Sequence, residues 1–328
     1  MALLSVENLV TRYSTEMGDV KAVDDISFKV RQGEIFGLAG ESGCGKSTAM
    51  LSVINLLPSN GRIVSGSIKF HEYDLATIGK EALRDEIWWN RVSIVFQAAM
   101  NALNPVLSVG SQIVEPIMLH DTVTKQEAEE RVKELFELVG IDSMRINDYP
   151  HEFSGGMRQR AMIAMALACN PELIILDEPT TALDVIVQGE VLELIKDLQE
   201  RLNLSVLMVT HDLSVIAETC DTTGIMYAGK LVESADTRTI FKEPRHPYTQ
   251  GLIGAFLSLT GEWKRVEGIP GNPPNLLNPP PGCKFNPRCP YAKERCLQEE
   301  PESVEIGEGH SVACHFVDEV YEKVYGSE

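Results

Sequence analysis

One stretch, GESGCGKST at residues 40–48, constrains the fold more than any other part of the chain. It fits the pattern G-x-x-x-x-G-K-[ST], follows the apolar run EIFGLAG (34–40) and precedes a helix expected from Lys46 to before Pro58. The glycines let backbone N–H groups point at a phosphate, and the start of the helix adds its positive end. The stretch therefore predicts a phosphate-binding loop between a buried strand and a helix.

The side chains of this loop suit a nucleoside triphosphate with Mg²⁺. Lys46 can reach the β- and γ-phosphates, and Ser47 can hold the metal ion. Cys44 has two interpretations: a small residue that fills the loop, which we favour, or a thiolate stabilised by Lys46 and the helix N-terminus. The candidate nucleotide-binding residues of the loop are Gly40, Ser42, Gly43, Cys44, Gly45, Lys46, Ser47 and Thr48.

A second motif, LIILDEP, places two carboxylates at the end of a predicted buried strand. Asp177 suits a contact with Mg²⁺ through water, and Glu178 suits orienting and deprotonating an attacking water. Such a pair alone could be a solvated turn. Because it follows a phosphate-binding loop, we interpret it as the hydrolytic half of the site.

The rest of the chain predicts an α/β fold, with a P-loop NTPase core, a parallel sheet and N-terminal antiparallel strands. Residues 124–139 have a helical period, and Thr124 with Glu127 forms a capping-box pattern. A hairpin is expected to turn at Ala228-Gly229. Residues 269–282 hold six of the chain's 17 prolines, which predicts a linker or irregular wrap.

Composition excludes some classes of partner. Among 328 residues, 29 basic and 48 acidic side chains give a net charge of −19, which phosphate backbones repel, so no nucleic-acid partner is expected. The N-terminal segment lacks a basic region of a signal peptide, and no apolar run is long enough to span a membrane. These features predict a soluble, cytoplasmic chain.

Further motifs follow the order of one known family. FSGGM (153–157) resembles the signature loop of ATP-binding-cassette (ABC) ATPases, and TALD (181–184), with Asp184, resembles their D-loop. Gln97 resembles the glutamine of their Q-loop, His211 their switch histidine and Tyr13 their adenine-stacking aromatic residue. Together these motifs span residues 3–235.

The resemblance implies a site shared between two head-to-tail cassettes. Ser154, Gly155 and Gly156 would act on the nucleotide of a partner. Gln97, with Ser47 and Asp177, would contact Mg²⁺, and Gln97 and His211 would join Glu178 as catalytic residues. Two residues depart from the family pattern: Phe153 and Met157 replace the usual leucine and glutamine, which puts the contribution of the Met157 side chain in doubt.

Three more segments resemble the ATPase subunits of dipeptide, oligopeptide and nickel importers: NALNPV (101–106), HPYTQGLI (246–253) and GIPGNPP with the tail that follows it. The resemblance implies peptide uptake driven at the cytoplasmic face of the membrane. Its expected partners are a second, paralogous ATPase or a second copy, two membrane-spanning permease subunits and an extracytoplasmic substrate-binding protein. The alternative is a soluble ABC ATPase that acts as a nucleotide-driven regulatory or nucleic-acid clamp.

These expectations divide the chain into four parts. They are a nucleotide-binding core at 1–97 and 153–235, a helical subdomain at 98–152, a helical connector at 236–268, and a proline- and cysteine-rich C-terminal region at 269–328.

Four cysteines gather in that tail: Cys283, Cys289, Cys296 and Cys314. Two disulfides, a zinc site and an iron–sulfur cluster are all compatible with four thiols, and the spacing alone leaves zinc and iron–sulfur equally favoured. The resemblance to importer ATPases implies a [4Fe–4S] centre. We interpret it as a structural staple, since no electron path to the nucleotide site is apparent. His310 and His315 are read as non-ligands.

Overall fold

The computed structural model describes residues 2–97, 102–257 and 268–325. The chain forms two compact units, and each is described by itself. The first comprises Met1–Leu3, Val30–Ile35 and Thr77–Val209, and the second comprises Leu4–Lys29, Phe36–Ala76 and Thr210–Glu328. The expected Asn101 at the start of NALNPV lies outside the described residues.

An antiparallel sheet opens the second unit, in the order β2-β1-β4-β5. In β2 the buried residues Ile26, Phe28 and Val30 alternate with exposed ones, because successive strand residues face opposite sides of a sheet. Strand β4 pairs antiparallel with both β1 and β5, so the predicted N-terminal antiparallel strands are confirmed. The strands are β1 (Ala2–Thr15), β2 (Gly18–Arg31), β4 (Gly61–Phe70) and β5 (Tyr73–Asp74).

The second unit also contains a row of strands in the order β11-β12-β10-β9-β3. Strand β3 runs parallel to β9, whereas β9, β10, β12 and β11 pair antiparallel. The hairpin between β9 and β10 turns at Ala228 (φ +48°) and Gly229 (φ +81°), as predicted. These strands are β3 (Ile35–Ala39), β9 (Thr222–Tyr227), β10 (Lys230–Asp236), β11 (Val304–Gly307) and β12 (His310–Val312).

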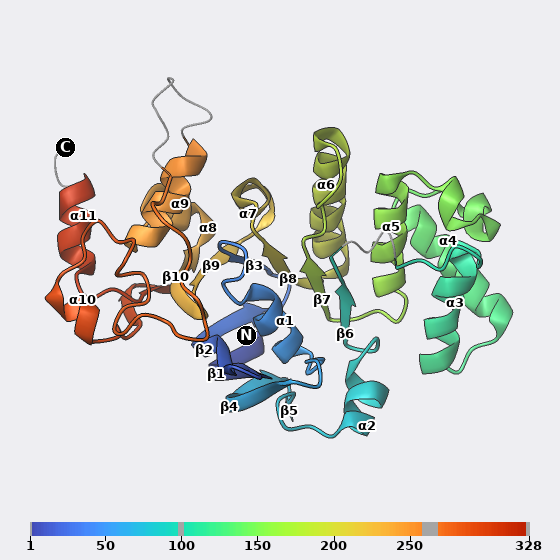
Figure 1. Cartoon of the computed structure of the whole chain (residues 1–328). Coiled ribbons are helices and arrows are strands. Elements are labelled where there is room, and N and C mark those ends of the chain that lie inside the picture. Colours follow the sequence, from blue (N-terminus) through green and yellow to red (C-terminus); the bar gives the residue numbers. More distant parts are fainter. Residues whose placement is uncertain (1, 98–101, 258–267, 326–328) are drawn as a thin grey trace. The chain divides into compact units, whose positions relative to one another are not determined.

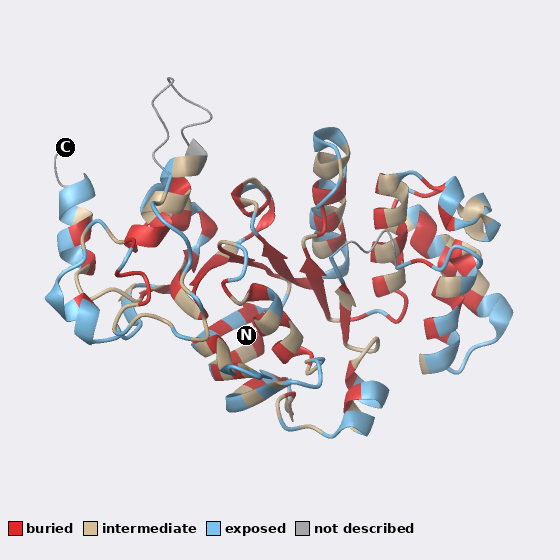
Figure 2. Cartoon of the chain, in the orientation of Figure 1, coloured by how far each residue is buried: buried red, intermediate tan, exposed pale blue. Residues whose placement is uncertain are grey.

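The first unit contributes three parallel strands, β6 (Val92–Val95), β7 (Leu173–Asp177) and β8 (Ser205–Thr210), in the order β8-β7-β6. Strands β7 and β8 are buried along their whole length (Figure 2), as their continuous apolar sequences predict. The expectation of a parallel sheet is correct for these strands. It is incomplete for the chain, because β9, β10, β12 and β11 pair antiparallel.

Helices α3, α4 and α5 of the first unit pack against one another (Figure 1), and α5 also contacts α6 and β6. Helix α6 turns Val191, Leu192, Ile195 and Leu198 inward at helical spacing. The helices are α2 (Lys80–Ala82), the π-turn η1 (Leu83–Ile87), α3 (Val109–His120), α4 (Lys125–Leu138), the 3₁₀ turns η3 (Ser143–Asn147) and η4 (Pro150–Glu152), α5 (Gly155–Ala166) and α6 (Val185–Leu202).

The helices of the second unit are mostly short. Between α9 and α10, the described residues 268–282 form neither helix nor strand, as the prolines predict. No helix in the described part of the chain combines the length and apolarity that crossing a bilayer requires. The helices are α1 (Lys46–Val53), α7 (Leu213–Thr219), α8 (Thr237–Lys242), α9 (Pro247–Leu257), α10 (Glu294–Gln298) and α11 (Val317–Tyr325).

The capping box of α4 gives the first prediction. The Glu127 amide donates to Thr124 Oγ1 at 3.3 Å, and the Thr124 amide donates to Glu127 Oε2 at 2.7 Å. Thr124→Ala should lower the free energy of unfolding by about 1 kcal/mol, because the Glu127 amide loses its acceptor and the Glu127 carboxylate loses the hydroxyl group that donates to it. Urea denaturation measures this. Thr122→Ala is the control, since Thr122 is exposed and precedes the cap; an equal loss in both variants would contradict the prediction.

Candidate functional site

The phosphate-binding loop leaves the buried strand β3 and enters α1 at Lys46, as the motif predicts. Gly40 (φ +150°), Gly43 (φ +78°) and Gly45 (φ +108°) all have positive φ. A Cβ atom at Gly40 would lie 2.2 Å from the Met226 carbonyl oxygen, and one at Gly45 would lie 2.2 Å from that of Ala22. The loop therefore needs glycine at both positions for space as well as for conformation.

Lys46 lies inside this loop. Its Nζ donates to the carbonyl oxygens of Gly40 at 2.7 Å and Glu41 at 3.1 Å, and the residue is only 6% exposed. These two carbonyls offset the cost of burying the ammonium group. They also hold it within the loop, where the sequence motif expects it to meet phosphate oxygens. Ser42, Ser47 and Thr48 lie in the same loop and the first turn of α1.

Cys44 is a filler of the loop rather than a reactive thiolate. It is 2% exposed, and burial raises its pKa, although Lys46, with Nζ 3.7 Å from Sγ, acts in the opposite direction. The thiolate interpretation is therefore wrong, because desolvation outweighs the neighbouring charge. The favoured interpretation, a small residue that completes the loop, agrees with this burial.

In the first unit, β7 ends at Asp177, and Glu178 follows with φ +49°. The Glu178 amide donates to the Val209 carbonyl at 2.8 Å. Its carboxylate Oε2 accepts from Gln97 Nε2 at 2.8 Å and from Thr181 Oγ1 at 3.0 Å. The structure thus brings together Gln97 and Glu178, which the sequence named separately, and adds Thr181, which it did not.

The predicted signature loop forms the start of α5. Ser154 caps the helix, with its Oγ accepting from the Met157 amide at 3.3 Å, and Gly155 begins the helix. Gly156 is buried, and a Cβ atom there would lie 2.5 Å from Val187 Cγ1 of α6. Glycine at this position therefore permits the close approach of α5 and α6.

The two residues that depart from the family loop meet at one side chain, Arg145. Its Nη1 donates to Met157 Sδ at 3.3 Å, and its guanidinium lies 4.8 Å from the ring centroid of Phe153. Arg145 also pairs with Asp148 at 2.7 Å. The Met157 side chain is therefore engaged within its own unit.

The remaining predicted residues lie at element ends and edges. Asp184 caps α6, accepting from the Val187 amide at 3.0 Å. His211 is exposed and lies between β8 and α7. Tyr13 is half-buried on β1 opposite Gly61 of β4, where a Cβ atom would lie 2.7 Å from the ring.

The C-terminal tail contacts the phosphate-binding loop, which sequence reasoning missed. Arg288 pairs with Glu41 of the loop through two hydrogen bonds, Nη1 to Oε2 at 2.6 Å and Nη2 to Oε1 at 3.0 Å. Tyr248 Oη accepts from the Glu41 amide at 3.0 Å. Tyr248 belongs to the HPYTQGLI segment, which the sequence analysis used only as a sign of the family. That segment could have indicated this contact, but it gave no role for the tyrosine.

A buried carboxylate joins the same segment to the tail. Glu233 is 1% exposed and accepts from the amides of Arg245 at 2.7 Å and His246 at 2.9 Å. Its Oε1 also lies 2.9 Å from His310 Nε2. His315 Nε2 lies 2.9 Å from the Glu299 carbonyl oxygen. Both tail histidines thus have partners outside the cysteine group, as expected of non-ligands.

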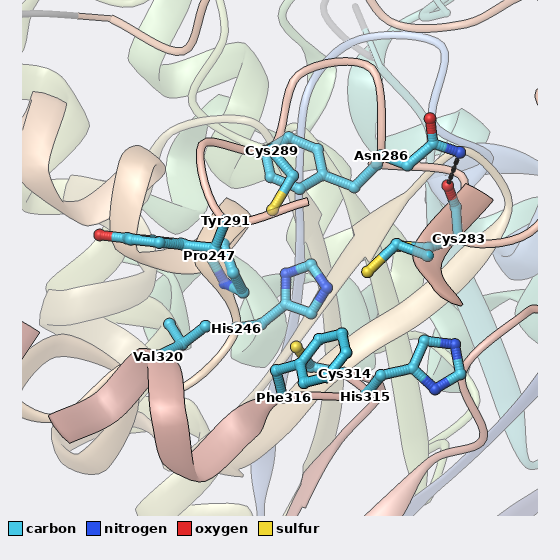
Figure 3. Close-up of a pocket in the computed structure, with 12 residues that line it drawn as sticks. His246, Pro247, Cys283, Asn286, Cys289, Tyr291, Cys314, His315, Phe316 and Val320 are labelled. Carbon is cyan, nitrogen blue, oxygen red and sulfur yellow. Dashed lines mark hydrogen bonds between the residues drawn. The ribbon is translucent and has the colours of Figure 1, made fainter. Parts of the chain in front are cut away.

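The four tail cysteines line one cavity of about 20 Å³, together with His246 and Phe285. Figure 3 shows Cys283, Cys289 and Cys314 around the His246 ring. All four are free thiols, so the disulfide alternative is not formed. Burial raises the pKa of Cys283 to about 11 and that of Cys289 to about 12, which keeps both protonated at neutral pH in the absence of a cation.

The four cysteine thiols are suitable metal ligands by their chemistry, but their side chains are not arranged as ligands of one metal ion. Within residues 2–97, 102–257 and 268–325, no group of three or more His, Cys, Asp or Glu side chains is arranged to hold a metal ion. The expectation of a bound [4Fe–4S] centre, or of zinc, thus gains no support from the side-chain positions. The sulfur atoms share a cavity without the spacing of ligands.

Two family models match the chain: "ABC transporter" over residues 23–181 and "Oligopeptide/dipeptide transporter, C-terminal region" over residues 232–296. The oligopeptide transport ATP-binding protein AppD of Bacillus subtilis (strain 168) is 44% identical over 320 residues, which cover 97% of each chain. The chain belongs to the dipeptide/oligopeptide family of ABC transporter ATP-binding proteins. The expected family is confirmed, and with it an ABC transporter ATPase, for which ATP and Mg²⁺ are the typical ligands.

Other relatives agree. The dipeptide transport ATP-binding protein DppD of Escherichia coli (strain K12) is 42% identical over 318 residues, covering 96% of this chain and 97% of the relative. The solved dimer of the ATP-binding cassette MJ0796 with ADP and Pi has a TM-score of 0.64 and 25% identity, and covers 72% of this chain and 99% of that one. The cbiO1 structure from Clostridium perfringens has a TM-score of 0.64 and 26% identity, and the match covers 79% of this chain and 95% of that one. The fold is that of an ABC ATPase.

The glycines of the loop give the second prediction. Gly40→Ala should lower the free energy of unfolding by at least about 2 kcal/mol, because a positive φ and an overlap with a backbone carbonyl add together. Gly43→Ala, whose Cβ meets nothing within 4 Å, should cost only about 1 kcal/mol from the backbone conformation. Denaturant titration compares the two. Equal losses would show that the Met226 carbonyl does not restrict the loop.

Proposed function

We propose that this chain hydrolyses ATP to drive uptake of dipeptides or oligopeptides through a membrane transporter. Its likeness to AppD and DppD extends over nearly the full length, and the C-terminal region matches the oligopeptide/dipeptide model. The observation that carries hydrolysis is the Glu178 carboxylate, oriented by Gln97 and Thr181 at the end of β7. The clamp alternative has no comparable support.

The residue roles follow from chemistry. The phosphate loop and Lys46 would hold the triphosphate, with Tyr13 against the adenine. Ser47, Gln97 and Asp177 would hold Mg²⁺, which neutralises phosphate charge when bound. Glu178 would orient a water for attack on the γ-phosphorus and accept its proton as the bond to the β-phosphate oxygen breaks, and His211 would contact the γ-phosphate.

The site is proposed to be completed by a second cassette in head-to-tail arrangement. Ser154, Gly155 and Gly156 would present a hydroxyl group and a helix N-terminus to the nucleotide of the partner, with Asp184 at the junction. The MJ0796 cassette, solved as a dimer, supports such pairing. The partner is a paralogous ATPase or a second copy.

Two permease subunits and an extracytoplasmic binding protein would complete the transporter, with this chain at the cytoplasmic face. The proposed helical subdomain at 98–152 is the docking region, and its described part exposes Val106, Leu119 and Met144 by 75%, 75% and 83%. Exposed apolar side chains of this kind suit contact with another subunit. The core at 1–97 and 153–235, the connector at 236–268 and the tail at 269–328 complete the proposed division.

Glu178→Gln gives the third prediction. In the purified transporter complex, the variant should bind ATP normally but lower the ATPase rate and the peptide uptake by about 10²- to 10⁴-fold, because an amide cannot accept the proton. Phosphate release and uptake of a labelled dipeptide into proteoliposomes measure both. Glu193→Gln, an exposed position on α6, is the control. Near-normal hydrolysis in Glu178→Gln would refute the assignment, and ATPase activity without peptide uptake would refute the cargo.

The tail cysteines are proposed to hold a metal centre, with [4Fe–4S] preferred by the family resemblance and zinc as the alternative. Cys283, Cys289, Cys296 and Cys314 would be the ligands, and the centre would cross-link a tail that has few apolar residues. The proposal rests on the donor set, since four thiols suit either centre, and all four line one cavity. A cavity of about 20 Å³ suits a single ion better than a four-iron cubane, so the loops would have to spread around a cluster.

Metal analysis gives the fourth prediction. Protein purified without oxygen should be brown and contain iron with acid-labile sulfide, and Cys289→Ser should lose the colour and loosen the tail to proteolysis. Cys169→Ser is the control, since Cys169 lies in the first unit. Colourless protein with stoichiometric zinc would show that the four cysteines hold zinc and not an iron–sulfur cluster. Metal-free protein with four free thiols and a protease-resistant tail would refute both.

A further inference from the structure

The phosphate-binding loop contains a carboxylate, that of Glu41, whose negative charge opposes the binding of phosphate groups. Glu41 follows Gly40, and its carbonyl oxygen holds Lys46 Nζ at 3.1 Å. A negative side chain inside a loop that receives a triphosphate repels that ligand, since charge interactions in a partly desolvated site are only weakly screened. Something must therefore neutralise Glu41 or hold its carboxylate aside.

Arg288 does both. Its two terminal nitrogens bind both oxygens of the Glu41 carboxylate, the paired geometry that gives the strongest arginine–carboxylate contacts. The arginine side chain is 5% exposed and that of Glu41 is 28% exposed. The pair is thus fixed and shielded from salt.

The rest of the guanidinium is also engaged. Its Nε donates to the Pro270 carbonyl at 2.8 Å, and Nη2 lies 3.4 Å from the Ile269 carbonyl oxygen. Nη1 lies 3.4 Å from Tyr227 Oη. Because all three guanidinium nitrogens have partners, Arg288 faces Glu41 in one orientation. Little side-chain entropy is therefore lost when the pair forms.

The tail segment that carries Arg288 is itself anchored to the second unit. The amides of Asn286 and Arg288 donate to the carbonyls of Cys283 at 2.9 Å and Phe285 at 3.0 Å, which forms a tight turn. Lys284 Nζ binds Asp24 Oδ2 at 2.7 Å, and the Phe285 ring packs against Tyr227 and Tyr248 at centroid distances of 5.1 and 5.4 Å. The position of Arg288 is thus set by the fold of the tail.

We infer that Arg288 is a positioning residue for nucleotide binding, through which the folded tail sets the affinity of the phosphate loop for ATP. It acts through Glu41 by cancelling and immobilising a charge that would otherwise oppose the phosphates. The inference rests on the proposed role of the loop in holding ATP. It does not depend on which cargo is transported.

The test compares ATP affinity among full-length variants with the cysteines intact, using fluorescent ATP. Arg288→Gln should weaken binding about tenfold, since one neutralising charge beside the phosphates is lost. Glu41→Gln should bind at least as tightly as the native chain. The double variant Arg288→Gln/Glu41→Gln should return close to native affinity, because no uncompensated carboxylate remains. The control Arg295→Gln breaks the exposed pair with Glu299 in the same tail and should change nothing.

The double variant separates this role from a merely structural one. If Arg288 only braced the fold, the double variant would bind as weakly as Arg288→Gln or more weakly, and that result would overturn the inference, as would native affinity in Arg288→Gln. If Arg288→Gln does not fold, Arg288→Lys replaces it: loss of the fork should weaken binding about threefold, and native affinity overturns the positioning role. In the ATPase assay of the complex, Arg288 variants should raise KM and keep kcat. A loss of kcat in these variants would overturn the positioning role, whereas failure of the native chain to bind fluorescent ATP would mark failure of the proposed function.

Discussion

The buried ammonium group of Lys46 is the contact on which the nucleotide site depends. A cation that is 6% exposed needs oxygen partners, and it takes them from the carbonyls of Gly40 and Glu41. In the same loop, Gly40 and Gly45 adopt positive φ, and a Cβ at either position would strike a carbonyl oxygen of a neighbouring strand. Backbone conformation and the buried charge therefore both restrict the sequence of this loop.

Much of this was predictable because it is local. The spacing of the loop motif places Lys46 at the start of a helix, Thr124 and Glu127 form the expected capping box, and Ala228-Gly229 turns the hairpin. In each case the residues that interact are within a few positions of one another, so sequence spacing is a direct measure of distance in space. Gln97 and Glu178 are farther apart in the chain. The sequence predicts each of them as a site residue but not the hydrogen bond between them.

The tail could not be predicted in the same way. Arg288 and Glu41 are 247 positions apart, and no local pattern shows that a cysteine-rich segment returns to the phosphate loop. Strand β12 joins β10 through pairs such as Glu233 with Val312, which depend on the register of two distant strands. The thiolate interpretation of Cys44 failed for a related reason: its neighbours in sequence favour the charged form, but burial depends on the whole fold.

The signature loop shows how a departure from a family pattern can be absorbed locally. Phe153 and Met157 replace a leucine and a glutamine, and both contact Arg145, one through its ring face and one through its sulfur. The same arginine pairs with Asp148 and donates to the Glu152 carbonyl at 2.9 Å. The two substitutions thus form one cluster behind the loop. Because Ser154 still caps α5 and Gly156 still permits its approach to α6, the hydroxyl group and backbone amides at the helix start keep their geometry. The backbone donors that the proposed role of this loop requires therefore do not depend on a polar side chain at position 157.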